Sequence, residues 1–113
     1  MKVRICSLSK NEDFRSILNG KKINNKYSTI FFKEIDRLNS KQLNISFIAK
    51  KKLGNAVIRN KIKRRLKNIL REAIMKFQLN FDYSYLVIAK STMLNNEYTI
   101  IKETIFKDLK KIN

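Results

Sequence analysis

The sequence of 113 residues contains no histidine and no proline, and it has a single cysteine and only two glycines. Histidine is the usual general base near neutral pH, so its absence speaks against acid–base catalysis by the chain alone. One cysteine, Cys6, cannot form an internal disulfide, which fits a reducing compartment. With so few thiol and imidazole groups, the chain also offers almost no ligands for zinc.

Acidic residues are scarce as well. Nine Asp and Glu residues oppose 26 Lys and Arg residues, which leaves a net charge of +17. Such an excess repels itself in a compact protein, so it predicts a polyanionic partner: nucleic acid first, and an anionic membrane surface second. No signal peptide and no apolar run of membrane-spanning length is recognisable, and we expect a cytoplasmic protein.

The residues that are present favour a folded domain. The chain has seven Phe and four Tyr, and 43% of its residues are hydrophobic, which indicates one globular domain over residues 1–113. No Ser-His-Asp set, Cys-His pair or glycine-rich phosphate loop is present in the sequence. Asp36 and Asp82 could bind Mg²⁺, but single aspartates at turn or strand edges usually have a structural role. The residue types therefore indicate a binding protein.

Hydrophobic periodicity predicts six elements in the order α-β-β-α-β-α. Ser9 and Glu12 form a capping box at the start of the first helix, and Gly20 follows its end. Because a helix joins the second strand to the third, we expect these strands to be parallel within a mixed sheet. The predicted fold is an α+β sandwich with a mixed sheet of three to four strands and three helices. The elements are a helix at 9–19, strands at 27–35 and 43–50, a helix at 55–77, a strand at 82–90 and a helix at 96–112.

The long helix lies in the most basic part of the chain. Residues 50–71 read KKKLGNAVIRNKIKRRLKNILR, with ten Lys or Arg residues and no acidic residue. A solvated helix face normally mixes both signs of charge, and a membrane-bound helix needs an apolar side that is free to enter lipid. Here the core needs the apolar side, so the charged side predicts phosphate contacts. At about 100° per residue, the apolar side contains Ile62, Leu66, Ile69, Ala73 and Phe77, and the opposite side contains Asn60, Arg64, Lys67 and Arg71, flanked by Lys61 and Lys63.

Two predicted strand faces mix apolar, polar and cationic side chains. Such faces can stack single-stranded nucleotides, but aromatic residues of a small domain are also common in its core, and composition leaves both interpretations open. On the first strand, Phe31 shares its face with Tyr27, Thr29 and Lys33. On the second strand, Leu43, Ile45, Phe47 and Ala49 face one way, and Asn44, Ser46, Ile48 and Lys50 face the other.

Two segments resemble a known family. Residues 51–66, KKLGNAVIRNKIKRRL, are similar to the signature K-x-x-x-x-A-x-x-R-N-R-x-K-R of the bacterial ribonuclease P protein subunit. Residues 8–14, LSKNEDF, resemble the L-x-K-x-x-D-F element of the same family. The resemblance covers essentially the whole chain and implies a ribosomal-protein-S5-domain-2-like fold. It also implies a holoenzyme subunit of an endoribonuclease, in which a catalytic RNA with Mg²⁺ removes the 5′ leader of precursor tRNA.

The resemblance implies two sets of contact residues and no catalytic residue in the protein. Ribonuclease P RNA and precursor tRNA are the expected partners, with no membrane and no obligatory protein partner. The protein alone is expected to bind no cofactor, and Mg²⁺ is expected to be held mainly by RNA. The contacts to the catalytic RNA fall on Arg59, Asn60, Lys61, Lys63, Arg64, Arg65, Lys67 and Arg71. The contacts to the leader fall on Phe14, Leu18, Phe31, Lys52 and Lys90, and the mixed face of the second strand adds Ile48 and Lys50.

The chain departs from the family pattern at two of these positions. Lys61 stands where the family has a third-position Arg; it keeps the charge but lacks a planar fork for two-pronged contacts. Leu18 stands where the family often has an aromatic residue, which predicts weaker stacking. Two other interpretations remain: a general RNA-binding module such as a ribosomal protein or RNA chaperone, and a protein nuclease that acts alone. The missing histidine and the scattered carboxylates speak against the nuclease.

Overall fold

The computed structural model describes residues 4–6, 11–34, 42–76, 83–94 and 96–112. These residues form five strands, three α-helices and two short 3₁₀ helices. The strands are β1 (Arg4–Cys6), β2 (Lys21–Asn24), β3 (Ser28–Glu34), β4 (Gln42–Ile48) and β5 (Tyr83–Ala89). The helices are α1 (Asn11–Leu18), α2 (Ala56–Lys76) and α3 (Tyr98–Lys111), with the 3₁₀ helices η1 (Lys51–Leu53) and η2 (Ser91–Met93).

The strands form one mixed sheet in the order β1-β4-β5-β3-β2. β4 pairs with β5 in parallel, as the helical connection between them predicts, and β1 joins β4 in parallel. β3 pairs antiparallel with both β5 and β2. The α+β class and the mixed sheet are confirmed, but the sheet has five strands rather than three to four. The two strands that the sequence did not reveal are edge strands of three and four residues, too short for a clear alternation.

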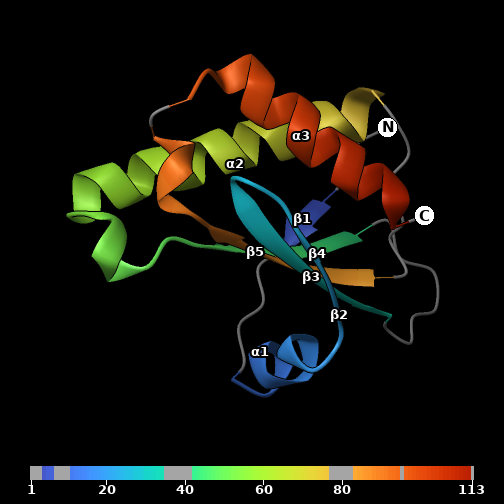
Figure 1. The fold of residues 1–113 in the computed structure, drawn as a ribbon. Helices are drawn as coiled ribbons and strands as arrows, with labels where there is room; N and C mark the ends of the chain where they lie inside the picture. Colours follow the sequence, from blue (N-terminus) through green and yellow to red (C-terminus); the bar gives the residue numbers. More distant parts are fainter. Residues whose placement is uncertain (1–3, 7–10, 35–41, 77–82, 95, 113) are drawn as a thin grey trace.

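The helices cover both faces of the sheet (Figure 1). α2 and α3 lie on one face, and α1 lies on the other. The main core lies under α2 and α3, where Tyr85 and Val87 of β5 pack with Ile62 and Leu66 of α2. Ile17 and Leu86 are also buried, but outside this cluster, on the side that α1 covers. Leu86 lies between two core residues of β5 and therefore points to the opposite face.

Tyr27 does not share the face of Phe31, contrary to the expected alternation. It is 4% exposed and belongs to the main core. The reason is a turn before β3, in which Oδ1 of Asn25 accepts hydrogen bonds from the backbone N–H groups of Tyr27 and Ser28. Because the backbone curls around this side chain, the twofold alternation of a strand begins only after Tyr27. Thr29, Phe31 and Lys33 do share the face opposite to the core.

Gly20 follows α1 at the predicted position. Its N–H donates to the carbonyl of Ile17, and the chain then enters β2. Glycine is needed there because a Cβ atom would lie 2.7 Å from the carbonyl oxygen of Phe32. Ser9, Phe77, Asp82 and the predicted turn at 36–41 lie outside the described residues. No helix in the described ranges is long and apolar enough to cross a membrane.

Candidate nucleic-acid interface

The exposed side of α2 forms a continuous cationic surface. The helix buries Ile62, Leu66, Ile69, Leu70 and Ala73, and this buried stripe sets which side faces solvent. Four of the five residues that the sequence placed on the apolar side are thus confirmed there, while Phe77 lies outside the described residues. Six exposed polar and cationic residues of this helix are named here the helix surface: Asn60, Lys61, Lys63, Arg64, Lys67 and Arg71.

The start of α2 is fixed by local contacts. Oδ1 of Asn55 accepts a hydrogen bond of 3.0 Å from the N–H of Ile58, which caps the helix. Gly54 before it has φ of 147°, a conformation that side chains rarely adopt. The first turn contains no acidic residue, so the positive end of the helix dipole adds to the charge of the first cations. The position of Arg59 and Asn60 relative to the sheet is therefore set by the fold.

Two arginines of the predicted RNA set are only half-exposed. Arg65 donates from Nη1 to the carbonyl oxygens of Met93 at 3.0 Å and Asn96 at 3.4 Å. One branch of its guanidinium is thus used inside the protein, which the sequence did not predict. Nε of Arg59 is buried and has no hydrogen-bond partner among the described residues. Burial of its inner part restricts how the outer part of this side chain can move.

The sheet face opposite to α2 presents a mixed surface beside α1. The strand register aligns Ser46, Leu86 and Phe31 in one row and Ile48, Ile88 and Thr29 in the next. Phe31 and Ile48 are half-buried, so both remain partly accessible. We name Phe31, Ile48, Ile88 and Thr29 the sheet surface. Phe31 and Ile48, which the sequence placed on the mixed faces of two separate strands, thus lie on one face of the sheet.

α1 borders the sheet surface. Leu18 at the end of this helix is 47% exposed, which is high for a large apolar side chain. Lys33 Nζ donates to Oγ of Ser16 over 2.7 Å and ties the helix to β3. Phe14 lies in the helix, but its side chain is outside the part that the structure describes.

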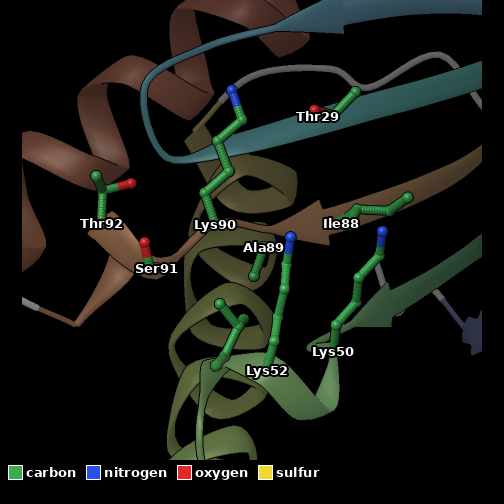
Figure 2. A pocket seen from close by; sticks show the side chains of 9 residues that line it. Thr29, Lys50, Lys52, Ile88, Ala89, Lys90, Ser91 and Thr92 are labelled. Carbon is green, nitrogen blue, oxygen red and sulfur yellow. The ribbon is translucent and has the colours of Figure 1, made fainter.

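A groove of about 580 Å³ continues the sheet surface towards η1 and η2. Figure 2 shows the side chains of Lys50 and Lys52 reaching into it in the same direction, with Lys90 at the end of β5 beside them. The groove thus brings together three of the predicted leader contacts. Its described lining has no carboxylate and consists of Thr29, Lys50, Lys52, Leu53, Ile88, Ala89, Lys90, Ser91 and Thr92.

The ammonium group of Lys90 is held in place by the hairpin that joins β2 to β3. Nζ donates to Oδ1 of Asn24 and to the carbonyl oxygen of Asn25, both at 2.6 Å. Sequence analysis did not single out these asparagines, nor Ser91 and Thr92. Only Ser91 and Thr92 could have been suggested by the sequence, because they directly follow Lys90.

The fold and these surfaces define a class: a basic α+β protein with two surfaces suited to bind nucleic acid. Ammonium and guanidinium groups contact phosphates, and apolar side chains between them can stack on bases. η1 connects the groove to α2, since Lys52 and Leu53 line the groove and α2 begins shortly after them in the chain.

Comparison with known proteins identifies the family. The Ribonuclease P family profile matches residues 3–113. The ribonuclease P protein component of Carboxydothermus hydrogenoformans is 34% identical over 105 residues, covering 91% of this chain and 87% of that protein. The one from Fusobacterium nucleatum is 36% identical over 110 residues, with coverage of 94% and 92%. This chain therefore belongs to the ribonuclease P protein family, whose members are subunits of the tRNA-processing endoribonuclease.

Solved structures share the fold of this chain. The ribonuclease P protein from Thermotoga maritima superposes with a TM-score of 0.80, covers 95% of this chain and 97% of that one, and is 23% identical. The Staphylococcus aureus protein gives a TM-score of 0.75 at 25% identity, with coverage of 94% and 93%. The expected fold is thus confirmed.

Proposed function

We propose that the helix surface of α2 binds ribonuclease P RNA, and that the sheet surface and the groove receive the 5′ leader of precursor tRNA. One observation supports this assignment of two partners: α2 and the sheet surface lie on opposite sides of the sheet, and η1 connects the groove to α2. With the catalytic RNA on the helix surface, the leader of a bound precursor tRNA would lie in the groove on the other side of the sheet.

The chemistry of each surface suits its proposed partner. Exposed cations on a rigid helix can neutralise phosphates of a folded RNA and release its counterions. Asn60 among them adds a planar donor and acceptor for base edges or 2′-hydroxyl groups. The sheet surface is suited to a single strand, because Phe31 and Ile48 can contact unpaired bases while Lys50 and Lys52 hold the backbone.

Hydrolysis in this proposal belongs to the RNA. In the described parts of the chain, no three His, Cys, Asp or Glu side chains come together. We propose that RNA holds the Mg²⁺ of the holoenzyme. The protein contributes binding: it grips the leader and compensates the charge of the RNA where the two meet.

Reconstitution at low Mg²⁺ tests this function. The protein is added to a bacterial ribonuclease P RNA, and cleavage of a precursor tRNA is measured against the RNA alone. We expect the protein to raise cleavage, and Arg64→Ala to reduce this gain more than Lys107→Ala, which also removes an exposed cation, but from α3. Unchanged cleavage with RNA binding intact would indicate a general RNA-binding module. Cleavage by the protein without the RNA would indicate a protein nuclease.

A further inference from the structure

The hairpin between β2 and β3 carries a hydrogen-bond network that the proposed contacts do not explain. Asn25 is its centre. Its Oδ1 accepts from the backbone N–H groups of Tyr27 and Ser28, both at 2.8 Å, and its own N–H donates to the carbonyl of Ser28. These bonds fix the direction of the backbone carbonyl of Asn25, which is one of the two acceptors of Lys90 Nζ.

Asp108 on α3 holds Asn25 from the other side. Its Oδ2 accepts a hydrogen bond of 2.8 Å from Nδ2 of Asn25, although 83 positions separate the two residues. Asp108 is only 6% exposed. Burying a carboxylate is costly unless it is hydrogen-bonded. Core packing alone therefore does not explain why an aspartate occupies this position. Asp108 also forms an ion pair with the exposed Lys111, whose Nζ lies 3.7 Å from its Oδ1.

The network ends at a cation of the groove. Both acceptors of Lys90 Nζ are uncharged, so they position the ammonium group without cancelling its charge. The backbone N–H of Lys90 also donates to the carbonyl of Tyr27, which anchors the residue to the same hairpin. A free lysine side chain loses much rotamer entropy when it binds a ligand. A lysine that is already fixed loses less, so it binds a phosphate more tightly.

We propose that Asp108 is a positioning residue for leader binding: through Asn25 it fixes the hairpin carbonyl that holds Lys90 at the groove. The inference rests on the proposed function, since it takes the leader to be the ligand of Lys90. It assigns α3, which lies on the opposite side of the sheet from the sheet surface, a role in substrate binding. The leader contributes a phosphate to this contact, and Asp108 never touches the leader itself.

The test uses the reconstituted holoenzyme and measures leader discrimination, the ratio of its affinities for precursor tRNA and for mature tRNA. We expect Lys90→Ala to lower this ratio by about threefold to tenfold, the range of one phosphate contact with its ordering cost. Asp108→Ala should lower it by a similar factor. In the Lys90→Ala background, Asp108→Ala should have no further effect, because the two residues act through one contact.

Two control variants separate positioning from a general loss of structure. Asp108→Asn keeps an acceptor oxygen for Asn25 and should retain most of the discrimination. Lys111→Ala removes the ion pair of Asp108 but not its bond to Asn25, and should leave the ratio unchanged. If thermal unfolding shows that Asp108→Ala does not fold, Asp108→Ser takes its place in the comparison of the single variants with the double variant.

The outcomes are distinguishable. The positioning role would be overturned if Lys90→Ala and Asp108→Ala lowered leader discrimination additively, or if Lys111→Ala lowered it as much as Asp108→Ala. Either result would leave leader binding in the groove intact. An unchanged ratio for Lys90→Ala itself would overturn both the positioning role and the proposed leader contact at Lys90.

Discussion

Arg65 of α2 donates a hydrogen bond from Nη1 to the backbone carbonyl of Met93 across 3.0 Å. This contact joins the basic helix to η2, whose first two residues line the groove. Its neighbour Arg64 is exposed, and no such bond is seen for it among the described residues. Two adjacent arginines of the basic helix therefore differ: Arg64 is exposed and available for the proposed RNA contact, and Arg65 fastens the helix to η2.

Arg65→Ala should reduce stability, because it removes a charged hydrogen-bond donor from a carbonyl that is partly shielded from water. A loss of about 1.5–3 kcal/mol is typical of such bonds. For a domain of this size it corresponds to a fall in Tm of roughly 5–15 °C. Arg64→Ala is the matched control and should change stability by less than about 0.5 kcal/mol. Equal Tm values for the two variants, measured by thermal unfolding, would contradict the assigned difference.

Arg64→Ala should instead weaken binding to ribonuclease P RNA and flatten its salt dependence. Each phosphate contact that is lost reduces the slope of log K against log salt by about one unit. Adding Arg59→Ala should reduce the slope again. Affinity is measured across a salt series, with Lys107→Ala as a control that removes one charge from α3. If Lys107→Ala changed the slope as much as Arg64→Ala, the RNA would not be specific for the helix surface.

Phe31 and Phe32 offer a matched pair, since neighbouring residues of a strand face opposite sides of the sheet. Phe32 is 8% exposed and packs edge-to-face against Tyr83 at 5.7 Å between ring centroids. Phe31→Ala should weaken binding of precursor tRNA by about 1–3 kcal/mol if a base stacks there, and should spare mature tRNA. Phe32→Ala should instead lower stability by about 3–5 kcal/mol. Equal weakening of both tRNA forms by Phe31→Ala would make Phe31 a structural residue.

The sequence was sufficient to predict α2 because charge and hydropathy both follow the helical period in this segment. Ile62 and Arg64 are nearly adjacent in the chain, yet their periodic pattern assigns them correctly to core and solvent. The helical period does not predict the contacts of Arg65, since its carbonyl partners come from residues about thirty positions away. A contact between a side chain and a distant backbone group leaves no periodic signal in a sequence.

The sheet shows the same limit. β4 and β5 are long enough to alternate or to form an apolar run, and their parallel pairing was predicted correctly. β1 and β2 are too short for either pattern. Tyr27 was misplaced because the side chain of Asn25 organises a turn that only the folded backbone reveals. Lys52 and Lys90 were predicted from family resemblance and Lys50 from the mixed face of the second strand, but the hairpin that positions Lys90 was not predicted.

Gly20→Ala should destabilise the protein, although replacing glycine by alanine usually lowers the conformational entropy of the unfolded chain. Its Cβ would lie 2.7 Å from the carbonyl oxygen of Phe32, so either α1 or β3 has to move. Such overpacking costs about 1–3 kcal/mol. Asn19→Ala changes the exposed residue just before it and serves as the control. Denaturant unfolding compares the two, and a fully stable Gly20→Ala variant would show that the end of α1 can shift at no cost.

Tyr98 provides the last prediction, which concerns alkaline pH. Its hydroxyl donates to Oε2 of Glu72 over 2.8 Å and joins α3 to α2. Burial, followed by the hydrogen bond to Glu72, raises the pKa of Tyr98 from 10.0 to about 12. Glu72 also pairs with Lys102 at 3.5 Å, and the hydrogen bond from Tyr98 is the main cause that lowers the pKa of this carboxyl group.

The sign of the effect follows from the two states. Between pH 10 and 12 the phenol ionises in the unfolded chain but stays protonated in the folded protein, so the unfolded state binds fewer protons. The free energy of unfolding must then fall as the pH rises through this window, and the contribution of Tyr98 is fully present below pH 10. Tyr98→Phe should be less stable near neutral pH, because Glu72 loses its donor. It should also lose less of its remaining stability between pH 10 and 12, because phenylalanine does not ionise. Urea unfolding of both proteins across this range measures the difference, and parallel pH profiles would show that Tyr98 ionises equally in both states.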